Sequence, residues 1–119
     1  AIAPLVLAEF IHVTTDPRRF ARPLTLNDAF NAADAWWTAA DVVQVFPTSA
    51  SVTLALDWMR QFRLGRKRVL DTQLAATYFC SGIRRILTAN PGDYTVFGVF
   101  DMLSPLPGAS GTDAADLKE

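Results

Sequence analysis

Apolar residues recur along this chain at two spacings, one typical of helices and one typical of short buried strands. In four segments they lie three and four residues apart, so that they would line one face of a helix. Three short apolar runs follow these segments, and each is bounded by turn-forming residues, as strands are. Such alternation predicts an α/β fold, with parallel strands between helices. The helices are expected to begin near residues 4, 25, 49 and 71, and the strands to cover 42–46, 86–88 and 99–103.

Local signals predict where the helices begin and end. Pro4 suits a first helical turn, and Thr25 is a good N-cap residue. Thr48 or Ser49 is expected to cap the third helix, and Gly82 to stop the fourth, which begins near Asp71. The predicted inner faces of these two helices carry Val52, Ala55, Leu56, Met59 and Phe62, and Leu74, Ala75, Tyr78 and Phe79, respectively.

Length and composition favour one globular domain. Of the 119 residues, 50% are hydrophobic and 19% are charged, which suits a packed core and not a disordered chain. Residues 1–107 are expected to form this domain and 108–119, which are small, polar and acidic, a disordered tail. No apolar run reaches the roughly 18 residues of a membrane span, and a cytoplasmic location is expected. Cys80 is the single cysteine, and its helical, apolar surroundings predict a buried structural thiol.

Charge is distributed unevenly along the chain. The formal net charge is −1, but the last twelve residues hold three acids and one lysine, so the body has ten Lys/Arg against nine Asp/Glu. Five of these cations lie within the nine positions from Arg60 to Arg68, and three more surround Phe20. The larger cluster has two interpretations, a solvated helix end that complements the helix dipole or a surface that contacts phosphates. The sequence leaves both open.

Three acids stand next to apolar sequence, where a charge needs a partner: Glu9, Asp71 and Asp93. Carboxylates that come together repel one another unless one is protonated or a cation lies between them. Oxygen ligands without a Cys/His set favour Mg²⁺ or Mn²⁺ over zinc. Glu9 has a second interpretation, as an acid at the solvent margin of an amphipathic helix. Spacing alone would look similar in other small α/β domains.

Three segments, in order, resemble the PIN domain, and within it the VapC-type toxins of toxin–antitoxin pairs. The first, PLVLAEFIHVTTDPRRF, resembles the family's helix with a metal-binding Glu, here Glu9. The second, RVLDTQLAATYFCSGIRRILTANPGDYTVF, resembles its D-x-x-[LI]-A-A … G … T-x-[DN]-x-x-D-[FY] block. The third, GVFDMLSPL, resembles its closing strand. The resemblance covers about residues 3–106 and implies a three-layer α/β/α sandwich around a parallel sheet.

This resemblance implies a Mg²⁺- or Mn²⁺-dependent endoribonuclease, in which acids hold the metal that activates water. Glu9 and Asp71 match acids of the family's metal site. Asn90 stands where the family usually has an Asp, so Asn90 or Asp93 would complete the set, with Thr88 in support. RNA, a cognate antitoxin and a second copy of the chain are the implied partners. The residues expected to contact RNA are Arg18, Arg19, Arg22, Arg66, Lys67 and Arg68.

One departure from the family concerns its first strand. PIN domains begin with a strand that carries a D-x-N motif, and this sequence has nothing resembling it. An N-terminally incomplete fold, inactive by itself, is therefore expected. An alternative function follows, an inactive PIN-type module that only binds a partner. A hydrolase that uses Ser or Cys is disfavoured, because there is no G-x-S-x-G elbow and His12 has no nucleophile beside it.

Overall fold

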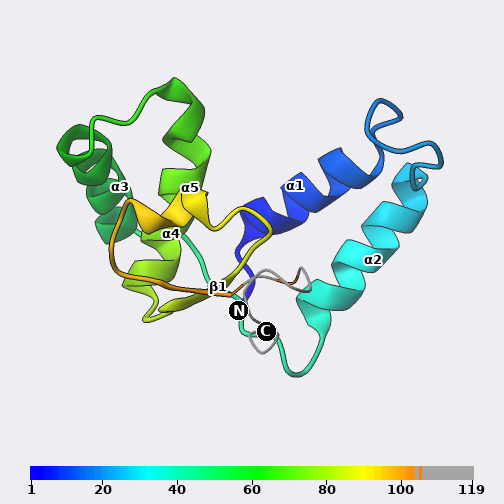
Figure 1. The fold of residues 1–119 in the computed structure, drawn as a ribbon. Coiled ribbons are helices and arrows are strands. Elements are labelled where there is room, and N and C mark those ends of the chain that lie inside the picture. Colours follow the sequence, from blue (N-terminus) through cyan, green and yellow to red (C-terminus); the bar gives the residue numbers. More distant parts are fainter. Residues whose placement is uncertain (104, 106–119) are drawn as a thin grey trace. The chain divides into compact units, whose positions relative to one another are not determined.

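The computed structural model describes residues 1–103 and 105, and the chain forms two compact units, Ala1–Phe46 and the part from Pro47 onward. Helices and a two-stranded parallel sheet occur in the described residues, as an α/β fold requires (Figure 1). None of the helices in this part of the chain is long and apolar enough to cross a membrane. The elements are α1 (Pro4–Thr14), α2 (Leu26–Thr38), α3 (Ser49–Gln61), η1 (Arg66–Arg68), α4 (Val69–Cys80), β1 (Arg85–Leu87), α5 (Gly92–Thr95) and β2 (Asp101–Leu103).

The N-terminal unit is a hairpin of α1 and α2. The Thr25 hydroxyl accepts a hydrogen bond from the Asp28 backbone N–H at 3.1 Å, which confirms the predicted N-cap of α2. Ala29 and Ala33, 0% and 5% exposed, are the buried residues of this helix. Their small side chains let α1 approach closely, and the ring of Phe10 then meets that of Trp36 edge-on at 4.5 Å. The ring of Trp37 also meets that of Phe46 edge-on at 5.7 Å, so small residues and two aromatic contacts hold this unit together.

The predicted strand at 42–46 is wrong. Only one parallel bridge forms there, between Ile2 and Gln44. Two hydrogen bonds make it: the Ile2 N–H donates to the Val43 carbonyl at 2.8 Å, and the Val45 N–H donates to the Ile2 carbonyl at 3.0 Å. The partner segment enters α1 at Pro4, so the ladder has no residues over which to continue. An apolar, β-branched run without a long enough partner stays irregular.

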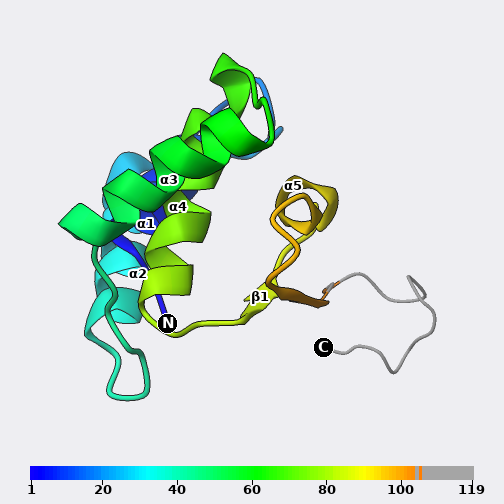
Figure 2. The ribbon, with the colours of Figure 1, turned by 90° about the vertical axis from the view of Figure 1, so that its left-hand side faces the viewer.

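In the C-terminal unit, α3 and α4 lie side by side and antiparallel (Figures 1 and 2). Thr48 caps α3 in a reciprocal capping box with Ser51, as one of the two predicted caps. The buried face of α3 differs from the predicted one. It consists of Ser51, Ala55 and Trp58, whereas Val52 and Leu56 are 43% and 52% exposed.

Trp58 explains this rotation of α3. Its ring stacks on Phe97 with centroids 4.6 Å apart and meets Phe79 and Phe100 edge-on. A tryptophan buries more apolar area than a valine or a leucine, so turning it inward outweighs leaving two aliphatic side chains outside. The buried core of this unit is Ala55, Trp58, Ala75, Ala76, Ile86, Tyr94 and Phe97.

The predicted face and end of α4 are confirmed. Leu74, Ala75 and Tyr78 are buried and Phe79 is half-buried. Gly82 has φ of +83°, and the Ile83 N–H reaches back to the Tyr78 carbonyl at 2.9 Å, in the pattern of a glycine-terminated helix. Because a left-handed φ strains residues with a Cβ, glycine suits this position.

Cys80 is exposed, which corrects the predicted buried thiol. It lies two positions after the buried Tyr78, and successive helical residues are about 100° apart around the axis. The cysteine therefore points away from the core, although apolar Phe79 precedes it.

The sheet joins β1 and β2 in parallel, with Ile86 opposite Met102. The Thr88 N–H continues the ladder to the Leu103 carbonyl at 3.0 Å. The strands predicted at 86–88 and 99–103 thus exist, each shortened or shifted by one or two residues, while Val99 and Phe100 pack against the core. Pro107, the domain boundary there and the predicted tail at 108–119 lie outside the described residues.

Candidate active site

The structure brings Asp71 and Asp93 into one site. Asp71 is in the first turn of α4, and Asp93 is in the first turn of α5, which packs against α4 and follows β1 in the chain. Each thus lies at the start of a helix, where backbone N–H groups favour negative charge. The two acids predicted on either side of β1 therefore lie close enough to influence each other's charge.

Electrostatics at Asp71 are unfavourable to its ionised form. Burial raises the pKa of Asp71 above its ordinary value, and the Asp93 carboxylate raises it further. The Arg68 guanidinium acts in the opposite direction and does not cancel the two. A carboxyl in this setting gains from a proton or from a cation placed beside it.

Arg68 has partners that its place in a basic cluster did not predict. Its side chain is 27% exposed, its Nη2 donates to the backbone carbonyl of Asp93, and its Nε lies 3.8 Å from Oδ2 of Asp71. The sequence expected Arg68 to face RNA together with Arg66 and Lys67. Instead its guanidinium points to the two acids, whereas Arg66 and Lys67 are exposed.

Thr88 and Asn90 shape the turn that carries Asp93. The Thr88 hydroxyl accepts a hydrogen bond from the Asn90 backbone N–H at 3.1 Å. The Asn90 carbonyl in turn accepts from the Asp93 N–H at 3.0 Å. The side chain of Asn90 is exposed and is able to offer its carbonyl oxygen to a ligand. Thr88 therefore supports the site through the backbone of this turn.

Glu9 lies on the exposed side of α1, in the N-terminal unit, whereas Asp71 and Asp93 lie in the C-terminal unit. In residues 1–103 and 105, no three His, Cys, Asp or Glu side chains form a metal-binding group. Within its own unit, Glu9 has the solvent-exposed position of its second interpretation. Its role as a metal ligand stays a prediction.

Apart from Arg68, the cations predicted to contact RNA fall into two classes. Arg18 and Arg19 form ion pairs with Asp16, with N–O distances of 3.2 and 3.6 Å. The backbone N–H of Arg18, followed by its guanidinium, lowers the pKa of Asp16, so this carboxylate stays ionised. Arg22, Arg66 and Lys67 are exposed and form no ion pair with a described residue. Of the predicted RNA contacts, these three are the most available to a polyanion.

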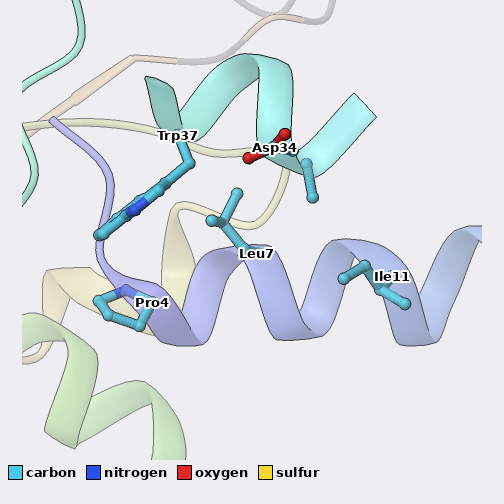
Figure 3. A pocket seen from close by; sticks show the side chains of 6 residues that line it. Pro4, Leu7, Ile11, Asp34 and Trp37 are labelled. Atoms are coloured by element: carbon cyan, nitrogen blue, oxygen red, sulfur yellow. The ribbon is translucent and has the colours of Figure 1, made fainter. Parts of the chain in front are cut away.

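A pocket of about 240 Å³ lies between α1 and α2, and none of the candidate site residues lines it. Trp37 of α2 extends toward Pro4 at the start of α1, and Leu7 points up toward α2 (Figure 3). Ile11 and Ala33 complete walls that are mostly apolar, and Asp34 is the one charged residue among them. No group in this lining is arranged for acid–base or nucleophilic chemistry, and the sequence pattern did not predict the pocket.

No protein-family model matches the chain, and no curated protein is significantly similar to it. The resemblance to PIN domains therefore rests on the three sequence segments and stays a prediction. In the structure, the segment with the D-x-x-[LI]-A-A block carries two acids that interact, Asp71 and Asp93. Arg68, which the sequence predicted to contact RNA, lies beside Asp71.

Proposed function

We propose that this protein is a Mg²⁺- or Mn²⁺-dependent endoribonuclease of the PIN-domain, VapC-toxin type. The proposal is supported by the pair formed by Asp71 and Asp93, since Arg68 contacts both the Asp71 carboxylate and the Asp93 backbone carbonyl. A three-layer α/β/α sandwich belongs to the same proposal. So do a cognate antitoxin and a second copy of the chain as partners.

The residues of the acid pair fit a hard divalent cation. Mg²⁺ is commonly held by one or two carboxylates, keeps several waters, and takes further oxygens from phosphates. Asp71 and Asp93 supply two carboxylates, and Asn90 adds an amide oxygen in the same turn. Glu9 would complete the set as a further carboxylate. When bound, such an ion supplies Lewis acidity and a more acidic water for phosphodiester hydrolysis.

The residues of the chain itself would bind and orient the substrate. Asp71, half-buried at the start of α4, fixes one ligand direction on a regular helix, which is more rigid than a loop. Thr88 fixes the turn that carries Asp93. Arg66 and Lys67, exposed on the segment that leads into α4, would bind the RNA backbone near the acids.

Labelled RNA tests this proposal directly. The native, full-length gene product is incubated with RNA in Mg²⁺, in Mn²⁺ or in EDTA, and the products are separated on a gel. Cleavage is expected with either metal and not in EDTA, and added metal should restore it. Cleavage that is insensitive to EDTA, or none with any metal, would contradict the proposal.

The second candidate function is a partner-binding module without catalysis. Exposed apolar side chains on α2 favour it, since Leu26 is 57% exposed, Phe30 50% and Trp36 46%. Large apolar side chains gathered on one helix commonly mark a surface that another protein covers. RNA that stays intact with every metal, together with Mn²⁺-independent binding of an antitoxin, would favour this module over the enzyme.

Replacing Arg66 and Lys67 together by Ala is expected to weaken RNA binding and its dependence on salt. Each phosphate contact with single-stranded RNA contributes about 0.7 to the slope of log affinity against log salt, so the slope should fall by about 1.4. Fluorescence anisotropy with labelled RNA at several salt concentrations measures it. Arg18→Ala with Arg19→Ala removes the same charge from residues already paired with Asp16, and a smaller change is expected. An unchanged slope in the Arg66/Lys67 variant would exclude these contacts.

A further inference from the structure

Arg68 links two segments that are 25 residues apart in the chain. It ends η1 immediately before α4, and its guanidinium donates through Nη2 to the backbone carbonyl of Asp93. The same guanidinium approaches the Asp71 carboxylate, with Nε 3.8 Å from Oδ2. One planar group therefore contacts the turn that carries one acid and the side chain of the other.

The Nε of Arg68 is a buried donor without a hydrogen bond in the described structure. At 3.8 Å, Oδ2 of Asp71 lies beyond the usual N–H···O range of about 2.7–3.2 Å. Leaving a buried charged donor unpaired is unfavourable. A small movement of either side chain would bring Nε and Oδ2 within hydrogen-bond distance. Arg68 is the one described cation within ion-pair distance of the Asp71 carboxylate.

We propose that Arg68 is a positioning residue that holds Asp71 and Asp93 facing each other before any cation binds. Two carboxylates repel, and this repulsion opposes the packing of buried Tyr94, which anchors the turn with Asp93 to the core. The hydrogen bond to the Asp93 carbonyl holds this turn, while the positive charge offsets part of the repulsion. Arginine suits the position because its fork reaches both partners at once, whereas a lysine ammonium offers one point charge.

This role predicts a local effect on backbone motion. In Arg68→Ala, the amides of residues 93–97 are expected to exchange with deuterium about tenfold faster or more, because a charge-assisted hydrogen bond is lost. The amides of the α3–α4 core should keep their protection. Arg66→Ala is the matched control. It also removes one positive charge, two residues before Arg68, but from a side chain that is exposed. Its exchange should equal that of the wild-type protein.

Metal affinity is the second measurement, and this part rests on the proposed function. Calorimetric titration with Mn²⁺ should show binding weakened about tenfold or more in Arg68→Ala, as is usual when a group that orients ligands is removed. Arg68→Lys should lie between that variant and wild type, and Arg66→Ala should bind Mn²⁺ normally but RNA more weakly. If Arg68 only repelled the metal, its removal would instead tighten Mn²⁺ binding.

Several outcomes separate the two proposals. Unchanged exchange at 93–97 in Arg68→Ala, or Mn²⁺ binding as tight as that of wild type or tighter, would overturn the positioning role. If amides throughout the C-terminal unit exchange faster in Arg68→Ala, this variant has unfolded. Exchange at residues 93–97 in Arg68→Lys, compared with exchange in the α3–α4 core, then decides. A wild-type protein that binds no Mn²⁺ overturns the proposed function, and the exchange data alone then decide the role of Arg68.

Discussion

Asp71→Asn is expected to reduce metal-dependent RNA cleavage on the order of 100-fold or more. A metal ion stabilises the charge that develops in the reaction by several kcal/mol, and each 1.36 kcal/mol is a factor of ten in rate. An amide keeps the shape of the side chain but loses the negative charge that would hold the ion. Gel-based cleavage at saturating Mn²⁺ measures the change in rate.

The same substitution is expected to raise stability at neutral pH. Since burial and Asp93 raise the pKa of Asp71 in the folded state above its ordinary value, the folded chain holds this proton more tightly than the unfolded chain. The stabilising contribution of the protonated form is therefore present at low pH and is lost as the pH rises through the folded pKa. Above it, ionised Asp71 destabilises the fold, and Asn removes this penalty.

Thermal melting of both proteins between about pH 3 and pH 7 checks this sign, because unperturbed aspartates titrate near 3.9. The melting temperature of Asp71→Asn should exceed that of wild type at pH 7, and the two should converge toward pH 3. Asp57→Asn, on the exposed part of α3 and paired with Arg60, is the control. It should keep full cleavage. A variant less stable than wild type at pH 7 would show that Asp71 is a structural acid.

Trp58→Ala should destabilise the C-terminal unit by about 3–5 kcal/mol, the usual cost of removing a large buried aromatic side chain. Trp58 is 7% exposed and contacts Phe79, Phe97 and Phe100, so a truncation leaves a cavity that three rings line. Urea unfolding followed by far-UV circular dichroism measures the free energy of unfolding.

Leu56→Ala is the matched control for Trp58→Ala. It lies on the same helix at 52% exposure, and its effect should stay within about 0.5 kcal/mol. Trp58→Phe keeps one aromatic ring against Phe97 and should lie between the two. Equal effects of Trp58→Ala and Leu56→Ala would mean that the face of α3 carrying Val52 and Leu56 is the buried one, as its spacing alone had suggested.

Signals confined to a few residues predicted the structure well. Thr25 and Thr48 cap the first turns of their helices, and Gly82 ends α4. Each of these effects lies within one helical turn, and each agrees with the prediction. The face of α3 was not predictable in this way. Both candidate stripes have helical spacing, and the choice depended on Phe97, a partner 39 positions away from Trp58. The run 42–46 failed for a similar reason, since its partner at Ile2 is too short.

At the candidate site, sequence predicted the acids and missed their neighbour. Asp71 and Asp93 stand out because each is a charge beside apolar sequence, and the structure has them interact. Arg68 is one of five cations in nine positions, and such a cluster gives no sign of which member turns inward. Its direction follows from the start of α4, where η1 aims this side chain at the turn with Asp93.

The exposed thiol at the end of α4 gives the chain a ready labelling position. Cys80 is its one cysteine, so a spin label or dye attached through sulfur would mark a single place without mutagenesis. Asp71 lies nine residues earlier on the same helix, which at 1.5 Å per residue is about 14 Å along the axis. A nitroxide at this distance is within magnetic reach of a Mn²⁺ ion at the acid pair. Helix α4 thus sets a known distance between a labelling position at its C-terminal end and the candidate site at its N-terminal end.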